Sequence, residues 1–115
     1  MEMVINKANV RVFDGVNLNS NQTSVLFELR QNSLYCVQHK WSGFTGTVTI
    51  YTEGTNFMDS TDDTEWFQVD TCVLNTGTGT RGINVEKAGY PFVRVRIVQT
   101  SGTGTLTTII NAKVL

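Results

Sequence analysis

The fold class is decided by the last quarter of the chain, which reads AGYPFVRVRIVQTSGTGTLTTIINAK from residue 88 to residue 113. From position 92 onward, apolar residues alternate with Arg94 and Arg96, which is the two-residue period of a β-strand. We expect the valines to face the core and the arginines to face solvent. The glycines and threonines that follow predict a tight turn, so that two strands, 92–100 and 105–114, form a hairpin.

The rest of the chain repeats this pattern of short alternating runs separated by turn residues. It predicts about eight strands, at residues 3–13, 23–29, 34–41, 45–52, 66–74, 81–86, 92–100 and 105–114. Short strands at such intervals are typical of an all-β, single-domain antiparallel β-sandwich or jelly roll. The expected core comprises Leu26, Leu34, Cys36, Val48, Ile50, Phe67, Val69, Val93, Val95, Ile97 and Ile110, with Trp41 near one edge.

The first 22 residues differ in kind from the sandwich domain expected at residues 23–115. Residues 3–13 predict either the first strand of the sandwich or an arm that pairs with the sheet edge of a neighbouring subunit. In the second case, the asparagine-rich segment 17–21 is the hinge. The sequence leaves both alternatives open.

The composition limits the classes of partner. A formal net charge of −1 lacks the basic face of a nucleic-acid binder, so no nucleic-acid partner is expected. The chain has no apolar run of about 20 residues that could cross a bilayer and no signal peptide, so we expect no membrane partner and synthesis in a host cytoplasm. Cys36 and Cys72 are interpreted as buried free thiols, with a disulfide between the sheets as the alternative.

The residues that could carry chemistry are few. The chain has a single histidine, His39, and Cys36 lies an odd number of positions away on the same expected strand, which places the two side chains on opposite faces. We therefore expect no enzyme, no catalytic residues, no structural zinc and no cofactor. The acidic loop is interpreted as solvated, with weak calcium ligation as the alternative. Its acidic residues are Asp59, Asp62, Asp63 and Glu65.

Several segments resemble small virion structural proteins of tailed bacteriophages. They are GYP at 89–91 leading into an arginine-bearing strand, TSGTGTL at 100–106, INAK at 110–113, YCVQ at 35–38 followed by Trp41 and Gly43, GTVTIY at 46–51, and an acidic loop that closes on Trp66. The similarity covers residues 33–113, although the loop 53–65 is longer and more acidic than the resemblance implies. The resemblance implies a place in a virion.

The leading hypothesis is a non-enzymatic capsid decoration or accessory protein that forms a homo-oligomer such as a trimer and docks on the major capsid or another virion protein. Val10 and Arg11 of the N-terminal segment, with Arg94 and Arg96, are the expected contacts, because guanidinium groups bind carboxylates bidentately. The alternative is a receptor-binding module of a tail or head fibre. Exposed rings of Trp41, Phe44 and Trp66 would then stack on host surface glycan.

Overall fold

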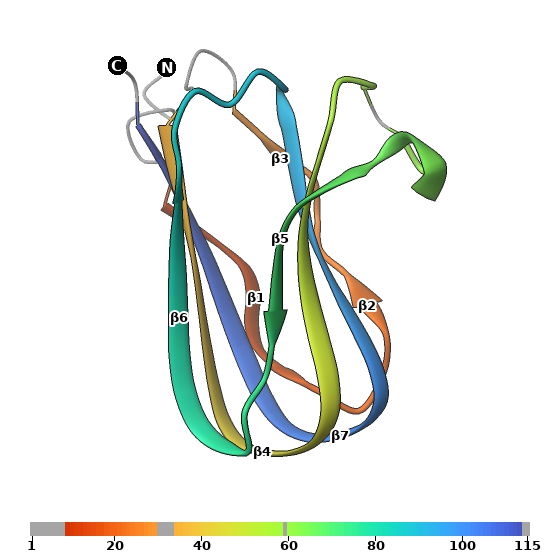
Figure 1. Ribbon diagram of the computed structural model, residues 1–115, viewed down its shortest axis with the longest axis vertical. Helices are drawn as coiled ribbons and strands as arrows, with labels where there is room; N and C mark the ends of the chain where they lie inside the picture. Colours follow the sequence, from red (N-terminus) through yellow and green to blue (C-terminus); the bar gives the residue numbers. More distant parts are fainter. Residues whose placement is uncertain (1–8, 30–33, 59, 114–115) are drawn as a thin grey trace.

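The computed structural model describes residues 9–29, 34–58 and 60–113, and these are built mainly of β-strands (Figure 1). A short 3₁₀ helix, η2 (Asp63–Glu65), precedes the fifth strand. The predicted all-β class is confirmed. The strands are β1 (Asn9–Asn17), β2 (Gln22–Thr23), β3 (Phe27–Glu28), β4 (Leu34–Thr55), β5 (Phe67–Val73), β6 (Gly77–Val85) and β7 (Phe92–Lys113).

Two long strands, β4 and β7, organise the fold. They pair antiparallel from one end to the other, with Leu34 opposite Lys113 and Thr55 opposite Phe92. Both strands run down, turn at the lower end of Figure 1 and return, so that one continuous seven-stranded sheet folds over on itself. The predicted antiparallel β-sandwich is therefore confirmed.

The fold gives two layers, which we name by their strands. In the first layer, β1 and β6 flank the paired segments 105–113 of β7 and 34–42 of β4. In the second layer, β2 and β3 lie along one edge of 92–99 of β7, and β5 lies along the outer edge of 48–55 of β4. Each half of the two long strands thus belongs to a different layer.

The prediction of a hairpin between residues 92–100 and 105–114 is wrong. Residues 92–100 and 105–113 pair with the two halves of β4 instead of with each other, and their second edges pair with β2, β3 and β1. Gly43, Gly46 and Gly104 have positive φ values of 64°, 120° and 103° at the bend. The backbones of β4 and β7 approach each other so closely there that a Cβ on Gly104 would lie 2.7 Å from the carbonyl oxygen of Ser42. Glycine therefore builds the corner between the layers.

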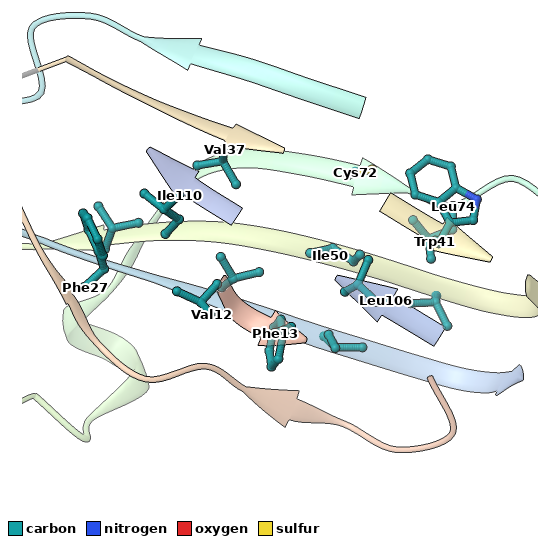
Figure 2. Close-up of a cluster of buried hydrophobic side chains, with 14 of the residues drawn as sticks. Val12, Phe13, Phe27, Val37, Trp41, Ile50, Cys72, Leu74, Leu106 and Ile110 are labelled. Atoms are coloured by element: carbon teal, nitrogen blue, oxygen red, sulfur yellow. The ribbon is translucent and has the colours of Figure 1, made fainter. Parts of the chain in front are cut away.

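One apolar core lies between the layers, and Figure 2 shows Val37 and Ile110 of the first layer in the same cluster as Ile50 of the second. Six expected core residues are fully or almost fully buried: Val48, Ile50, Val93, Val95, Ile97 and Ile110. Leu26 and Phe67 were expected inside but are exposed. Leu18, Tyr35, Phe44 and Leu106 fill the core without having been predicted.

The N-terminal segment is described from Asn9 onward. Residues 9–17 form β1, which pairs with β7 of the same chain, and the start of the expected segment lies outside the described residues. Leu18, in the asparagine-rich stretch, is fully buried and donates its N–H to the carbonyl of Gly104 over 3.0 Å. The pairing of residues 9–13 within the chain favours the first-strand alternative, and the arm of residues 3–13 with a hinge at 17–21 stays a prediction.

Candidate functional site

The outer face of the second layer holds a network of charged side chains. Glu53 of β4 lies opposite Arg94 of β7 in the sheet register. Its carboxylate accepts a hydrogen bond of 2.8 Å from Arg94 Nε and one of 2.9 Å from Arg96 Nη2. Arg96 Nε also donates to both carboxylate oxygens, at 3.3 and 3.2 Å. One carboxylate therefore fixes two guanidinium groups side by side.

The loop between β4 and β5 covers this network. Asp63 Oδ1 accepts a hydrogen bond of 2.9 Å from Arg94 Nη2, and the Arg94 guanidinium lies 4.4 Å from the centroid of the Trp66 ring. Asp62 caps η2 by accepting from the backbone N–H of Thr64. As a result Arg94 is only 6% exposed, so the expectation that it faces solvent is wrong. The alternation predicts on which face of the strand a side chain lies, whereas the covering loop decides how exposed that side chain is.

Burial makes these ion pairs interdependent. The side chains of Arg94 and Glu53 are each 8% exposed, and removing one member would leave the other charged and without its partner in a low-dielectric site. Arg96 is more open, at 33%, and its guanidinium lies 4.9 Å from the Tyr51 ring centroid. The hydrogen bonds to Glu53 raise the pKa of Arg96. Two cations and two carboxylates give the network no net charge.

Two adjoining hollows lie beside this network. One of about 320 Å³ is lined by Ser24, Leu26, Thr61 and Trp66 among others, and one of about 250 Å³ is lined by Asn21, Gln22 and Arg96 among others. Thr23 and Asp63 line both. Together they form a groove between segment 21–26 and loop 60–66, which we call the layer-two groove.

The three aromatic residues expected to be exposed are buried. Trp41 is 5% exposed and donates its indole N–H to the carbonyl of Asn75 over 3.0 Å, Phe44 is 0% exposed, and Trp66 is 8% exposed. The prediction of open rings for stacking is therefore wrong for all three. Phe57 and Met58, in the loop after β4, are instead 57% and 72% exposed. Sequence reasoning did not single out Met58 as a contact.

The outer face of the first layer differs from that of the second. The Arg11 side chain is 60% exposed on this face and pairs with Asp14 over 3.1 Å, whereas Val10, opposite the buried Ile110, lies on the inward side of the edge strand and is 38% exposed. Arg11 and Lys40 line a hollow of about 290 Å³. The structure thus places Arg11 and Arg94 on opposite outer faces of the sandwich, so the four expected contact residues do not form one surface.

His39 faces the core of the first layer. Its side chain is 1% exposed, Nδ1 lies 2.9 Å from Thr108 Oγ1, and Nε2 has no hydrogen-bond partner among the described residues. Burial lowers the pKa of His39 to about 4. Cys36 lies on the opposite, outward face of the same strand, so the two do not form a Cys–His pair. A neutral, enclosed imidazole cannot exchange protons with a bound substrate.

The described carboxylates of the acidic loop do not converge on one point. Asp62 caps η2, Asp63 pairs with Arg94, and Glu65 accepts from Ser60, while Asp59 lies outside the described residues. Within residues 9–29, 34–58 and 60–113, no group of three or more His, Cys, Asp or Glu side chains is placed to hold a metal ion. Cys36 and Cys72 are both free thiols, so the disulfide alternative is wrong; Cys72 is buried as expected, whereas Cys36 is only partly buried.

No protein-family model matches the chain, and no curated protein matches its sequence. Among solved structures, the chain is similar to the SPBc2 prophage-derived protein YomS, with a TM-score of 0.61, 18% identity and coverage of 91% of each chain. It is also similar to the K1 cleaved adhesin domain of Lys-gingipain from Porphyromonas gingivalis W83, with a TM-score of 0.55, 7% identity, and coverage of 93% of this chain and 73% of that one.

A third similar structure is that of a CBM4 module, with a TM-score of 0.50, 12% identity, and coverage of 81% of this chain and 61% of that one. At these identities the similarities establish the fold alone. The chain therefore has a β-sandwich fold that also occurs in a phage-derived protein, an adhesin domain and a carbohydrate-binding module. No helix in the described part of the chain is long and apolar enough to cross a membrane.

Proposed function

We propose that the chain is a non-enzymatic accessory protein of a bacteriophage particle that docks on the capsid as a homo-oligomer, with a trimer as the expected state. The observation that carries the proposal is the likeness to a prophage-derived protein over 91% of both chains. The sequence segments that resemble tailed-phage virion proteins, residues 33–113, include all of β4 to β7 and so span both layers. A place in the virion accounts for both the structural likeness and the sequence resemblance.

The chemistry of the described residues supports a binding role over a catalytic one. The single histidine is enclosed in the core, and the largest group of charged side chains is a neutral network in which Arg94 and Glu53 already have partners. Such a network rigidifies a surface. It does not supply the group with a pKa near neutrality that acid–base catalysis needs.

The loop after β4 supplies the contact. Phe57 and Met58 are neighbours in sequence and both are exposed, and aromatic residues and methionine are enriched in protein interfaces. Thr55 anchors the base of this loop, because its hydroxyl donates to the carbonyl of Glu65 over 2.6 Å and accepts from the N–H of Phe57 over 3.2 Å. Val10 and Arg11 on β1 provide a second contact. Arg94 does not, because it is committed to Glu53 and Asp63.

The test is the amount of the chain retained in purified particles, measured by quantitative mass spectrometry. We expect the double variant Phe57→Ser/Met58→Ser to lower incorporation at least about tenfold, because losing two anchor side chains costs well over 1.4 kcal/mol. The matched control is Val73→Thr, which makes a 65% exposed apolar residue on β5 polar and should change nothing. Absence of the wild-type chain from particles would refute the proposal. Light scattering that gave a monomer would refute the homo-oligomer.

A further inference from the structure

The layer-two groove presents hydrogen-bonding atoms that the fold itself does not use. Arg96 employs Nε and Nη2 for Glu53, so Nη1 has no partner among the described residues. Asp63 employs Oδ1 for Arg94, and its side chain is 78% exposed. The groove therefore offers a donor and an acceptor that line the same 250 Å³ hollow.

Uncharged polar side chains complete the lining. Gln22 donates its amide N–H to the carbonyl of Asn17 over 2.6 Å, which leaves its Oε1 as an acceptor. Thr23 and Thr61 both line the groove, and a threonine hydroxyl can donate and accept. Leu26, at 36% exposed, and Trp66, at 8% exposed, add apolar surface to the 320 Å³ hollow.

These groups are held in place before any ligand arrives. The Arg96 guanidinium is fixed by three hydrogen bonds to Glu53 and by the Tyr51 ring, and the loop that carries Asp63 is fixed by the Arg94 contact and by the η2 cap. Preorganisation lowers the entropy cost of binding. Rigid polar groups along an exposed groove therefore favour a binding role for it.

The charge balance selects the class of ligand. Arg94 and Arg96 are matched by Glu53 and Asp63, so an anion would gain little attraction and would meet the exposed Asp63 carboxylate. A polyol fits better, because each hydroxyl can accept from Arg96 while it donates to Asp63 or Gln22. The C–H faces of a sugar ring also suit the apolar patch of Leu26 and Trp66.

We propose that the layer-two groove binds an uncharged saccharide through Arg96, Asp63, Gln22, Thr23 and Thr61. This site differs from the stacking platform of Trp41, Phe44 and Trp66 that the sequence predicts, since those rings are buried. Recognition here depends on hydrogen bonds to sugar hydroxyls, with apolar contact as a minor part. The inference is independent of the virion proposal, because a sugar-binding chain that is absent from particles would refute the virion proposal alone.

The test begins with an array of neutral and acidic oligosaccharides, followed by an NMR titration of the full chain with the strongest neutral ligand. We expect saturable amide shifts at Thr23, Thr61 and Asp63. The variants Gln22→Ala and Asp63→Asn should each weaken binding about tenfold, as expected for the loss of a polar contact or of its charge. Melting temperatures of both variants exclude unfolding as the cause.

The matched control is Gln38→Ala, which removes the same side chain from the outer face of the first layer and should leave affinity unchanged. The proposal would be overturned by an array without neutral ligands, by shifts confined to the first layer, or by groove variants that bind as tightly as the wild type. Preferential binding of acidic oligosaccharides would also overturn it, because the charge argument would then be wrong.

Discussion

The two outer faces of the sandwich come from the same pair of long strands, yet they differ in charge and cover. In the second layer, Glu53 and Arg94 face outward and are nevertheless buried, because the loop before β5 covers them. In the first layer, Gln38 and Thr105 face outward and stay open to solvent. Strand alternation is the same in both layers. Long-range loop packing, and not the strand pattern, therefore decides which outward residues form a rigid network.

The substitution expected to lower the stability most lies where the two layers join. In Gly102→Ala, the new Cβ would overlap the carbonyl oxygen of Leu18 and lie 2.9 Å from Val48 Cγ2, and the backbone of Leu18 is itself held by its bond to Gly104. We expect a loss of at least about 4 kcal/mol in the free energy of unfolding, measured by urea denaturation. The matched change Gly82→Ala on edge strand β6, where the nearest atom is 3.7 Å away, should stay within about 1 kcal/mol. Equal losses of stability at both positions would contradict the claim that glycine is required at the corner between the layers.

The next effect concerns the covered face. Glu53→Gln keeps the shape of the side chain but leaves Arg94 and Arg96 without their shared carboxylate, so we expect a loss of about 3 kcal/mol in unfolding free energy. Fluorescence of Trp66 should report the loosening of the loop, since Arg94 stacks on its ring. Wild-type stability in Glu53→Gln would show that the network contributes nothing.

The core of the first layer should make stability depend on pH. The pKa of His39 is about 4 in the folded chain and 6.5 when exposed, because burial disfavours the cation. Between these values the unfolded chain binds a proton that the folded chain does not, so stability falls as pH drops from about 6.5 to 4. The total loss is about 3 kcal/mol. Asp70 and Arg81 act on the same imidazole in opposite directions.

Unfolding free energies of wild type and His39→Gln at several pH values measure this contribution. The difference between the two profiles should change across that pH range and stay constant above pH 7. A constant difference throughout would mean that His39 titrates normally and is accessible to solvent.

The smallest effect is expected on the open face. Arg11 and Asp14 form an ion pair whose side chains are 60% and 69% exposed, and exposed pairs contribute about 0.5 kcal/mol or less. Asp14→Asn should therefore leave the free energy of unfolding nearly unchanged and insensitive to salt. A loss comparable to that of Glu53→Gln would remove the contrast between the two faces.

Local pattern was sufficient for part of this architecture. The alternation at 92–98 correctly places Val95 and Ile97 in the core, because side-chain direction in a strand follows from the backbone alone. It could not reveal that Arg94 is covered, since that depends on Asp63 and Trp66 from a distant loop. The glycines near 102 indicate a change of direction, but a hairpin and a corner between layers require the same residue type.

The candidate site was less predictable than the fold. Glu53 was assigned only to the start of the acidic loop, and its role becomes visible once the β4–β7 register sets it opposite Arg94. The layer-two groove joins segment 21–26 to loop 60–66, which no sequence spacing connects. Phe44 was expected outside because it lies between the expected strands 34–41 and 45–52, yet the corner turns its ring into the core.

The most direct test of the virion proposal is a cryo-electron microscopy map of purified particles. It should show copies of this sandwich on the particle surface, with the Phe57–Met58 loop against a neighbouring virion protein and the layer-two groove open to solvent. Particles that are complete without any copy of the chain would contradict the account.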